Sequence, residues 1–274
     1  MSPCLAVLTD FFAVSNRTLS YAAGLAVPLR AHLLLVHVHH DALLAPEEFR
    51  EHHTWRGELK TFYALEKLAA EQPVPTEVDI SNDALADAVR EVVRERDPLL
   101  LLLGRPGYEG APPEVLTRTA TRLLRHVPFP LLVVPGPGWD KFPPRRLLLA
   151  VDGHHFRLGV HQSAVQHLLA ATGGTLDVVH VTDDEHARPE VATVLETIAE
   201  NDLPEAPLTA SQLHEVYHRD VLRGILEEAA RQAADLLVVV ARRHSFLGSL
   251  FHRSVTARLL QESPIPVLVL PAEE

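Results

Sequence analysis

Arginine residues in the C-terminal half of the chain stand where a short apolar run ends. Arg242 and Arg243 directly follow the apolar run that begins at Leu236, and Arg253 comes ten residues after Arg243. Guanidinium groups bind phosphate and carboxylate through charge-assisted hydrogen bonds. If the run is a parallel strand, these arginines lie at the carboxyl edge of a sheet, where open α/β sheets bind ligands. The sequence therefore allows two roles for these three arginines. They form an anion site, or their side chains fill the ligand space and exclude a nucleotide.

Histidines of the same half suggest a second chemistry, because neutral imidazole is a common zinc ligand. Three of them fall at or just after predicted strand ends, His154, His180 and His244, and a fourth, His252, lies just before the last predicted helix. The single cysteine, Cys4, excludes a multi-cysteine ligand set, and the one HExxH sequence, at 214–218, lies in a stretch that we predict to be mostly strand, where an i, i+4 pair does not share a helix face. We favour solvated or hydrogen-bonded histidines and keep zinc as the alternative.

The composition excludes several classes of function. The chain has 274 residues, 47% of them hydrophobic and 22% charged, and a formal net charge of −11. These values are typical of a globular protein and disfavour partners such as nucleic acid or an anionic membrane. We expect a cytoplasmic protein, because we find no secretory signal and no apolar run long enough to span a bilayer. Neither G-x-S-x-G nor G-x4-GK[ST] is present, so we expect a non-catalytic protein.

Four segments recur in the same order in the two halves of the chain. CLAVLTDFF opens the first copy and LLLAVDGHH the second, and each apolar run ends in an aspartate, Asp10 or Asp152. HLLLVHVHHD corresponds to LDVVHVTDDE, and VPFPLLVVPG to SPIPVLVLPA. DPLLLLLG (97–104) corresponds to DLLVVVAR (235–242), an offset of 138 residues. Such self-similarity predicts a duplicated domain, with the Pro/Gly-rich PGPGWDKFPP as the linker.

Within each copy, apolar runs alternate with helical patterns. The runs are almost continuously apolar, as in strands that are buried on both faces of a parallel sheet. One helix is predicted over Asn82–Arg96, with Asn82 as its N-cap, and its counterpart over Asp220–Ala234. We therefore predict two tandem doubly wound α/β domains, over residues 1–138 and 145–274, each with five strands.

The opening LTDFFAVSNRTLSYAAGLA, followed by HLLLVHVHH, resembles the first βαβ unit of the universal stress protein family. TRLLRHVPFPLLVVP and RSVTARLLQESPIPVLVLP are similar to that family's last helix and fifth strand. The resemblance covers nearly the whole chain twice. It implies a tandem member with strand order 3-2-1-4-5 in each half and a regulatory role in the stress response. It also implies pairing through the fifth strands, which two halves of one chain can supply as an intramolecular pseudo-dimer, with a homodimer of two chains as a further expectation.

Many members of that family bind ATP through a loop after the fourth strand, written G-x2-G-x9-G-[ST]. Glycines let the backbone approach the phosphates, and the following helix offers free N–H groups. The first copy keeps Gly104 and Gly107, but Thr117 stands where the pattern has its last glycine. The second copy lacks the glycines and keeps only the start of the following helix: Ser254, Val255 and Thr256. Neither copy carries the complete signature.

The resemblance further implies that the aspartate ending the first strand helps to hold the adenosine end of the nucleotide. Asp10 and Asp152 are the candidates, although either carboxylate could instead cap the following helix. The adenine would lie against the backbone at the end of the second strand, near Val38. We predict weak binding of ATP or a related adenine nucleotide in the first copy. The alternative is a nucleotide-free protein whose second copy holds a metal or an anion.

Overall fold

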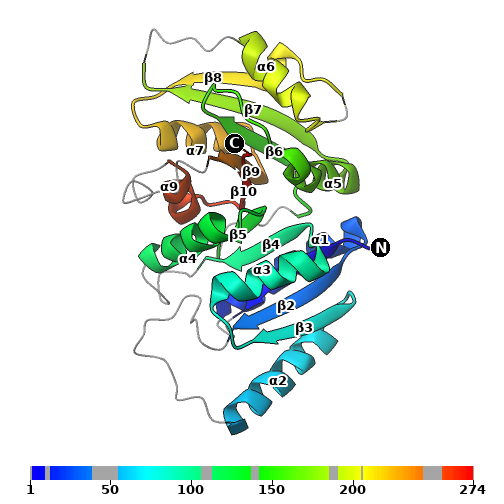
Figure 1. The fold of residues 1–274 in the computed structure, drawn as a ribbon. Coiled ribbons are helices and arrows are strands. Elements are labelled where there is room, and N and C mark those ends of the chain that lie inside the picture. The colour runs from blue at the N-terminus through cyan, green and yellow to red at the C-terminus, as the bar shows by residue number, and fades with distance from the viewer. Residues whose placement is uncertain are drawn as a thin grey trace. The chain divides into compact units, whose positions relative to one another are not determined.

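The strands of the protein are four to eight residues long, and most of them are apolar runs. The computed structural model describes residues 2–9, 13–38, 55–105, 113–136, 142–184, 191–204, 206–242 and 255–273. The chain separates into two units, Met1–Pro137 and Gly138–Glu274, each with its own strands and helices (Figure 1).

The first unit alternates strands and helices along the chain. In order, its elements are β1 (Cys4–Thr9), α1 (Ala13–Leu29), β2 (His32–Val38), α2 (Trp55–Ala70), β3 (Thr76–Ser81), α3 (Leu85–Arg96), β4 (Leu100–Gly104), α4 (Pro113–His126) and β5 (Leu131–Val134). All pairings are parallel and give the strand order β3-β2-β1-β4-β5. Every residue of β1, β4 and β5 is buried. For β1 and β4, which lie inside the strand order, this is expected of a parallel sheet with helices on both faces.

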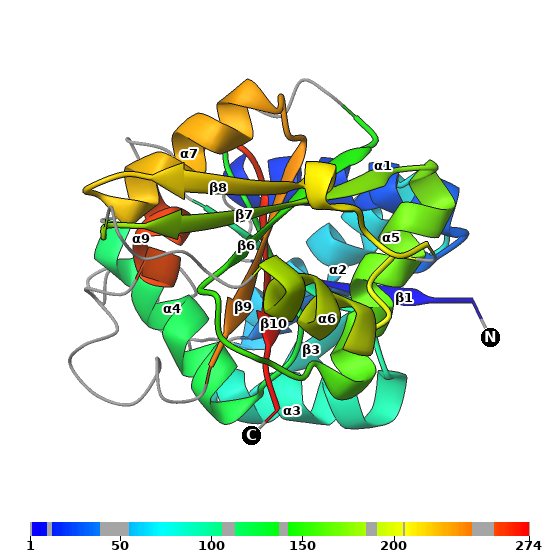
Figure 2. The same cartoon turned by 90° about the horizontal axis from the view of Figure 1, so that it is seen from above.

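The second unit repeats this arrangement. Its elements are β6 (Arg146–Val151), α5 (Ser163–Thr172), β7 (Thr175–Thr182), α6 (Val191–Glu200), β8 (Leu213–Tyr217), α7 (Val221–Arg231), β9 (Leu236–Ala241), α9 (Val255–Glu262) and β10 (Val267–Pro271). Parallel pairing gives the order β8-β7-β6-β9-β10, which is again 3-2-1-4-5. Helix α7 lies along β7 and β8 (Figure 2).

The predicted class of two doubly wound parallel α/β units is confirmed. Right-handed crossovers explain the layers, because connections that move in opposite directions along a parallel sheet place their helices on opposite faces. In the first unit, α1 packs on β1 and β4, whereas α3 packs on β2 and beside α4. None of the helices in the described part of the chain is both long enough and apolar enough to cross a membrane.

The sheet register corrects one correspondence between the copies. Leu5 pairs with Leu100, and the matching Leu147 pairs with Leu236, so the fourth strands correspond at an offset of 136 residues. The offset of 138 was wrong, because runs of leucine and valine contain no marker of register. Asp97 is the left-handed C-cap of α3, at φ 41°, and its true counterpart is Ala233, at φ 49°.

The predicted cap of α3 was also wrong. The helix begins at Leu85, and its N-cap is Ala84, which has no side chain that could accept a hydrogen bond. The backbone N–H of Asp83 donates to the Ser81 hydroxyl in a local turn that delays the helix start. In the second unit the equivalent cap is Asp220, whose carboxylate accepts from the N–H groups of Leu222 and Arg223.

Candidate functional site

The carboxyl ends of the strands provide the candidate sites. In the first unit the chain leaves β1 toward β2 and leaves β4 toward β5, so a switch point lies between β1 and β4. Thr9 ends β1, Val38 ends β2 and Gly104 ends β4, and all three are buried. Asp10 and Gly107 lie outside the described residues, and Thr117 falls within α4 with its side chain outside them.

His37 joins two strand ends at this edge. Its Nδ1 donates to the carbonyl oxygen of Thr9 over 3.0 Å, which links the last residues of β2 to the end of β1. The matching histidine in the second unit, His180, lies close to the backbone of Asp152, which directly follows β6. Its Nδ1 has no hydrogen-bond partner, so the Val-His-Val repeat places a histidine beside the end of the first strand in both units but does not repeat the bond made by His37.

Arg17 is a residue at the first switch point that the sequence patterns did not single out. It lies one turn into α1, and its guanidinium donates to the carbonyl oxygen of Gly136, just beyond β5. A β-carbon on Gly136 would lie 3.9 Å from the carbonyl oxygen of Arg105, which follows β4. A cation therefore lies near the ends of β4 and β5. The one feature of the sequence that could have indicated Arg17 is its place in the helix that follows the first strand.

In the second unit an ion pair spans the matching switch point, between β6 and β9. Arg242 donates from Nε to Oδ2 of Asp152 and from Nη2 to Oδ1, each over 3.1 Å. The same Nη2 donates to the carbonyl oxygen of His154 over 3.1 Å, and the His154 N–H donates to Asp152 Oδ1 over 3.1 Å. The carboxylate that the family resemblance made a nucleotide ligand is therefore already engaged by a guanidinium.

His180 is 8% exposed, and its Nδ1 has no hydrogen-bond partner in the structure. Burial lowers the pKa of His180, and the nearby backbone of Asp152 opposes that shift. The ring therefore favours the neutral form near neutral pH. Gly153 allows this packing, because a β-carbon there would lie 2.9 Å from His180 Nε2.

The described residues contain no group of three or more His, Cys, Asp or Glu side chains arranged to hold a metal. His154 and His180 are described, whereas His244 and His252 lie outside that part of the chain. Burial raises the pKa of the Cys4 thiol to about 11, so this side chain is neither a ready metal ligand nor a nucleophile near neutral pH.

The loop after β6 also differs from its counterpart in the first unit. Helix α1 begins at Ala13, a few residues after β1, whereas α5 begins at Ser163, after an irregular segment and a 3-10 turn, Gly159–Gln162. The side chain of Asn201 holds this segment: its amide donates to the Phe156 carbonyl over 3.0 Å, and its oxygen accepts from the Leu158 N–H over 2.7 Å. The start of the helix is thereby moved away from the end of β6.

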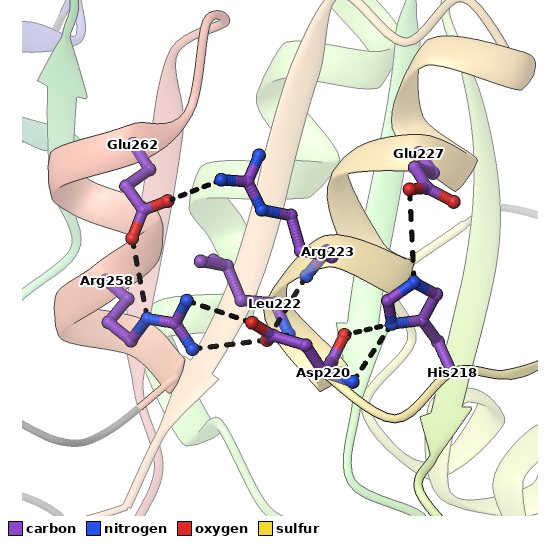
Figure 3. Close-up of polar contacts among 7 residues, drawn as sticks. All are labelled: His218, Asp220, Leu222, Arg223, Glu227, Arg258 and Glu262. Atoms are coloured by element: carbon purple, nitrogen blue, oxygen red, sulfur yellow. Dashed lines mark hydrogen bonds and ion pairs between the residues drawn. The ribbon is translucent and has the colours of Figure 1, made fainter.

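A second ion-pair cluster fixes the position of α9. Asp220, the N-cap of α7, accepts from Nη1 and Nη2 of Arg258, each over 3.1 Å (Figure 3). Arg258 Nε also donates to Glu262 over 3.4 Å. The hydrogen bonds from Arg258 to Asp220 hold the pKa of the Asp220 carboxyl below its ordinary value. The cluster thus anchors the first turn of α9.

Residues Val255 and Thr256 form the beginning of α9. The remaining candidates of the second copy lie outside the described residues: Arg243, Arg253 and Ser254.

Comparisons with known proteins agree with this duplicated architecture. The model of the universal stress protein family matches the chain twice, over residues 5–135 and 144–271. The chain therefore belongs to the universal stress protein family and carries two such domains in tandem. No curated protein matches it.

Two solved structures show the same fold. A universal stress protein from Archaeoglobus fulgidus DSM 4304 aligns over 98% of both chains with a TM-score of 0.66 and 15% sequence identity. A functionally unknown protein from Pseudomonas aeruginosa PAO1 aligns over 99% of this chain and 92% of its own, with a TM-score of 0.62 and 18% identity. At these identities the likeness concerns the fold alone.

Proposed function

We propose that this tandem universal stress protein is a non-catalytic regulatory module that binds one adenine nucleotide, at the switch point of its first domain. The proposed site consists of Asp10, the end of β2 at Val38, and the loop that starts at Gly104. Its occupancy by ATP or a related nucleotide would be the signal that a partner protein reads.

The observation that carries this proposal is the difference between the two switch points. In the first domain a glycine ends β4 beside the buried end of β1, and a glycine lets a ligand come close to the backbone. Arg17 adds a positive charge near the ends of β4 and β5, as a phosphate group requires. In the second domain Asp152 is paired with Arg242.

Isothermal titration of ATP into the full chain tests the proposal. We expect one nucleotide per chain, and we expect Asp10→Asn to abolish binding, because the carboxylate is assigned to the adenosine end. Asp152→Asn is the matched control from the second domain and should leave both the affinity and the stoichiometry unchanged. No binding tighter than millimolar, or equal losses in the two aspartate variants, would refute the proposal.

A second pair of variants separates the phosphate end from the adenosine end. Arg17→Met should weaken ATP binding more than adenosine binding, because only ATP carries the charge that the guanidinium neutralises. Gly104→Arg should abolish the binding of both ligands by filling the approach to the backbone. Equal effects of Arg17→Met on ATP and adenosine would remove Arg17 from the site.

A further inference from the structure

A buried carboxylate of α7 lies beside a histidine of the edge strand β8. Glu228 is 1% exposed, and its carboxylate accepts from Nη1 of Arg231 over 2.6 Å and from Nε2 of Gln232 over 2.7 Å. The Nδ1 atom of His214, in β8, lies 3.4 Å from Oε1 of Glu228. The Nε2 atom of His214 is buried and has no hydrogen-bond partner among the described residues, and it lies 3.9 Å from Oδ1 of Asp177 in β7. The imidazole therefore lies between two carboxylates that belong to two different elements.

The protonation state of His214 decides which of these groups it can bind. The Gln232 amide nitrogen lies 3.3 Å from Nδ1 and can only donate, so a neutral ring accepts this hydrogen bond and carries its proton on Nε2. The carboxylates of Glu228 and Asp177 can only accept. A neutral ring has one N–H group, whereas the charged ring has two and places one toward each carboxylate. Protonation thus exchanges Gln232 for Glu228 at Nδ1, while Gln232 keeps its own bond to Glu228.

The other charge at this contact is the guanidinium of Arg231. It lies on Oε2 of Glu228, the oxygen farther from His214, and its side chain is 67% exposed. In the described part of the chain, the two carboxylates around a neutral His214 ring face this one guanidinium, whereas around a charged ring they face two positive charges. The charged ring therefore balances the second acid.

A second histidine of β8, His218, also faces α7. Its Nε2 lies 3.9 Å from Oε1 of Glu227, and its Nδ1 lies 2.6 Å from the carbonyl oxygen of Asp220 and 3.0 Å from the backbone nitrogen of Asp220 (Figure 3). The side chain of Glu227 is 63% exposed, so solvent screens its contact with His218. The contact of His214 with the buried Glu228 is screened less.

We propose that His214 is a proton-responsive clamp on the edge strand β8: its charged ring binds Glu228 of α7 and Asp177 of β7 at the same time. Strand β8 has one neighbour in the sheet of its unit, β7, so contacts made by its side chains add to a single row of backbone hydrogen bonds. Imidazole changes its charge between about pH 5 and 8. The added contacts are therefore present at the acidic end of this range and are lost as the pH rises.

Hydrogen exchange of the full chain at about pH 8 and about pH 6 tests the proposal, which does not depend on a nucleotide. After correction for the intrinsic exchange rates, opening of the β8 amides should be about tenfold rarer at the acidic pH, the factor that one hydrogen bond with a charged group contributes. His214→Gln should remove this dependence, because glutamine does not titrate. His167→Gln is the matched control and should retain it, because His167 Nδ1 contacts the Ser163 carbonyl oxygen of its own helix over 2.8 Å.

Asp177→Asn separates the clamp from a merely structural role and serves equally if His214→Gln does not fold. It should reduce the protection of the β8 amides at about pH 6 and leave it unchanged at about pH 8, because the neutral ring makes no hydrogen bond to Asp177. A wild type without pH dependence, an equal dependence in His214→Gln, or equal losses in Asp177→Asn at both pH values would overturn the proposal. So would a dependence that disappears only in His218→Gln.

Discussion

Replacing Asn201 by leucine should release the loop that follows β6 and destabilise the second domain. Asn201 is 2% exposed, and its side chain makes three hydrogen bonds to backbone groups. Its amide donates to the carbonyls of Phe156 and Thr197 over 3.0 and 2.7 Å, and its oxygen accepts from the N–H of Leu158 over 2.7 Å. Leucine has a similar shape, so the substitution removes the polar contacts without opening a large cavity.

The magnitude follows from the groups that lose their partners. A hydrogen bond contributes about 0.5–1.5 kcal/mol net, and a buried donor or acceptor left unsatisfied costs about 1–3 kcal/mol. The Leu158 N–H and the Phe156 carbonyl count toward the loss, because both lose the Asn201 side chain as a partner. The Thr197 carbonyl is left out, because it lies in the last turns of α6. We expect the free energy of unfolding of the second domain to fall by roughly 3–5 kcal/mol.

Urea unfolding of the full chain measures this change, and hydrogen exchange of the Leu158 amide locates it. The exchange of that amide should accelerate in Asn201→Leu, because its only acceptor in the described structure is the Asn201 oxygen. Gln166→Leu is the matched control: Gln166 donates to the carbonyl of Asp202 at an exposed site, and its loss should cost less than about 0.5 kcal/mol. Unchanged exchange at Leu158, or a destabilisation no larger than that of the control, would refute the reasoning.

Two further predictions concern the strand ends of the second domain. Gly153→Ala should destabilise the domain and displace the His180 ring, because φ at Gly153 is +79° and a β-carbon would lie 2.9 Å from His180 Nε2; thermal unfolding and the histidine NMR signals report both effects. The Asp220–Arg258 pair should stabilise the protein at neutral pH and lose its effect in acid, because the folded-state pKa of Asp220 lies below the ordinary value of 3.8. Arg258→Met should therefore be less stable than the wild type at pH 7, and urea unfolding should show the difference shrinking as the pH falls below 3.8. A difference that is constant with pH would show that the ion pair does not contribute.

The strands were largely predictable from local pattern, whereas their order was predicted from the resemblance to the universal stress protein family. Continuous apolar runs such as Leu131–Val134 have one stable place, between two layers of helices, and their repetition identified a duplicated α/β fold. Local pattern did not determine the alignment within those runs. The register of β4 and β9 depends on how each strand meets its neighbour, so the offset of 138 was wrong by two residues.

The candidate sites were predictable as positions but not as contacts. Strand ends in the sequence located Asp152 and Arg242 at one edge of a sheet, as two separate candidates for two separate ligands. The structure pairs them across 90 residues of sequence. Arg17 was missed because its role depends on reaching the carbonyl of Gly136, which is 119 residues away in the sequence.

The sequence by itself determined the duplicated α/β fold, since burial of apolar runs and alternation with helical patterns are properties of neighbouring residues. Only the tertiary structure decided which charges at the strand ends are engaged. Hydrogen bonds of this kind depend on distances of about 3 Å between atoms from distant segments. The two copies share their strand order, yet Gly104 ends β4 in the first domain, whereas Arg242 follows β9 and closes on Asp152 in the second. That contact distinguishes the strand ends of the second domain from those of the first in the described part of the chain.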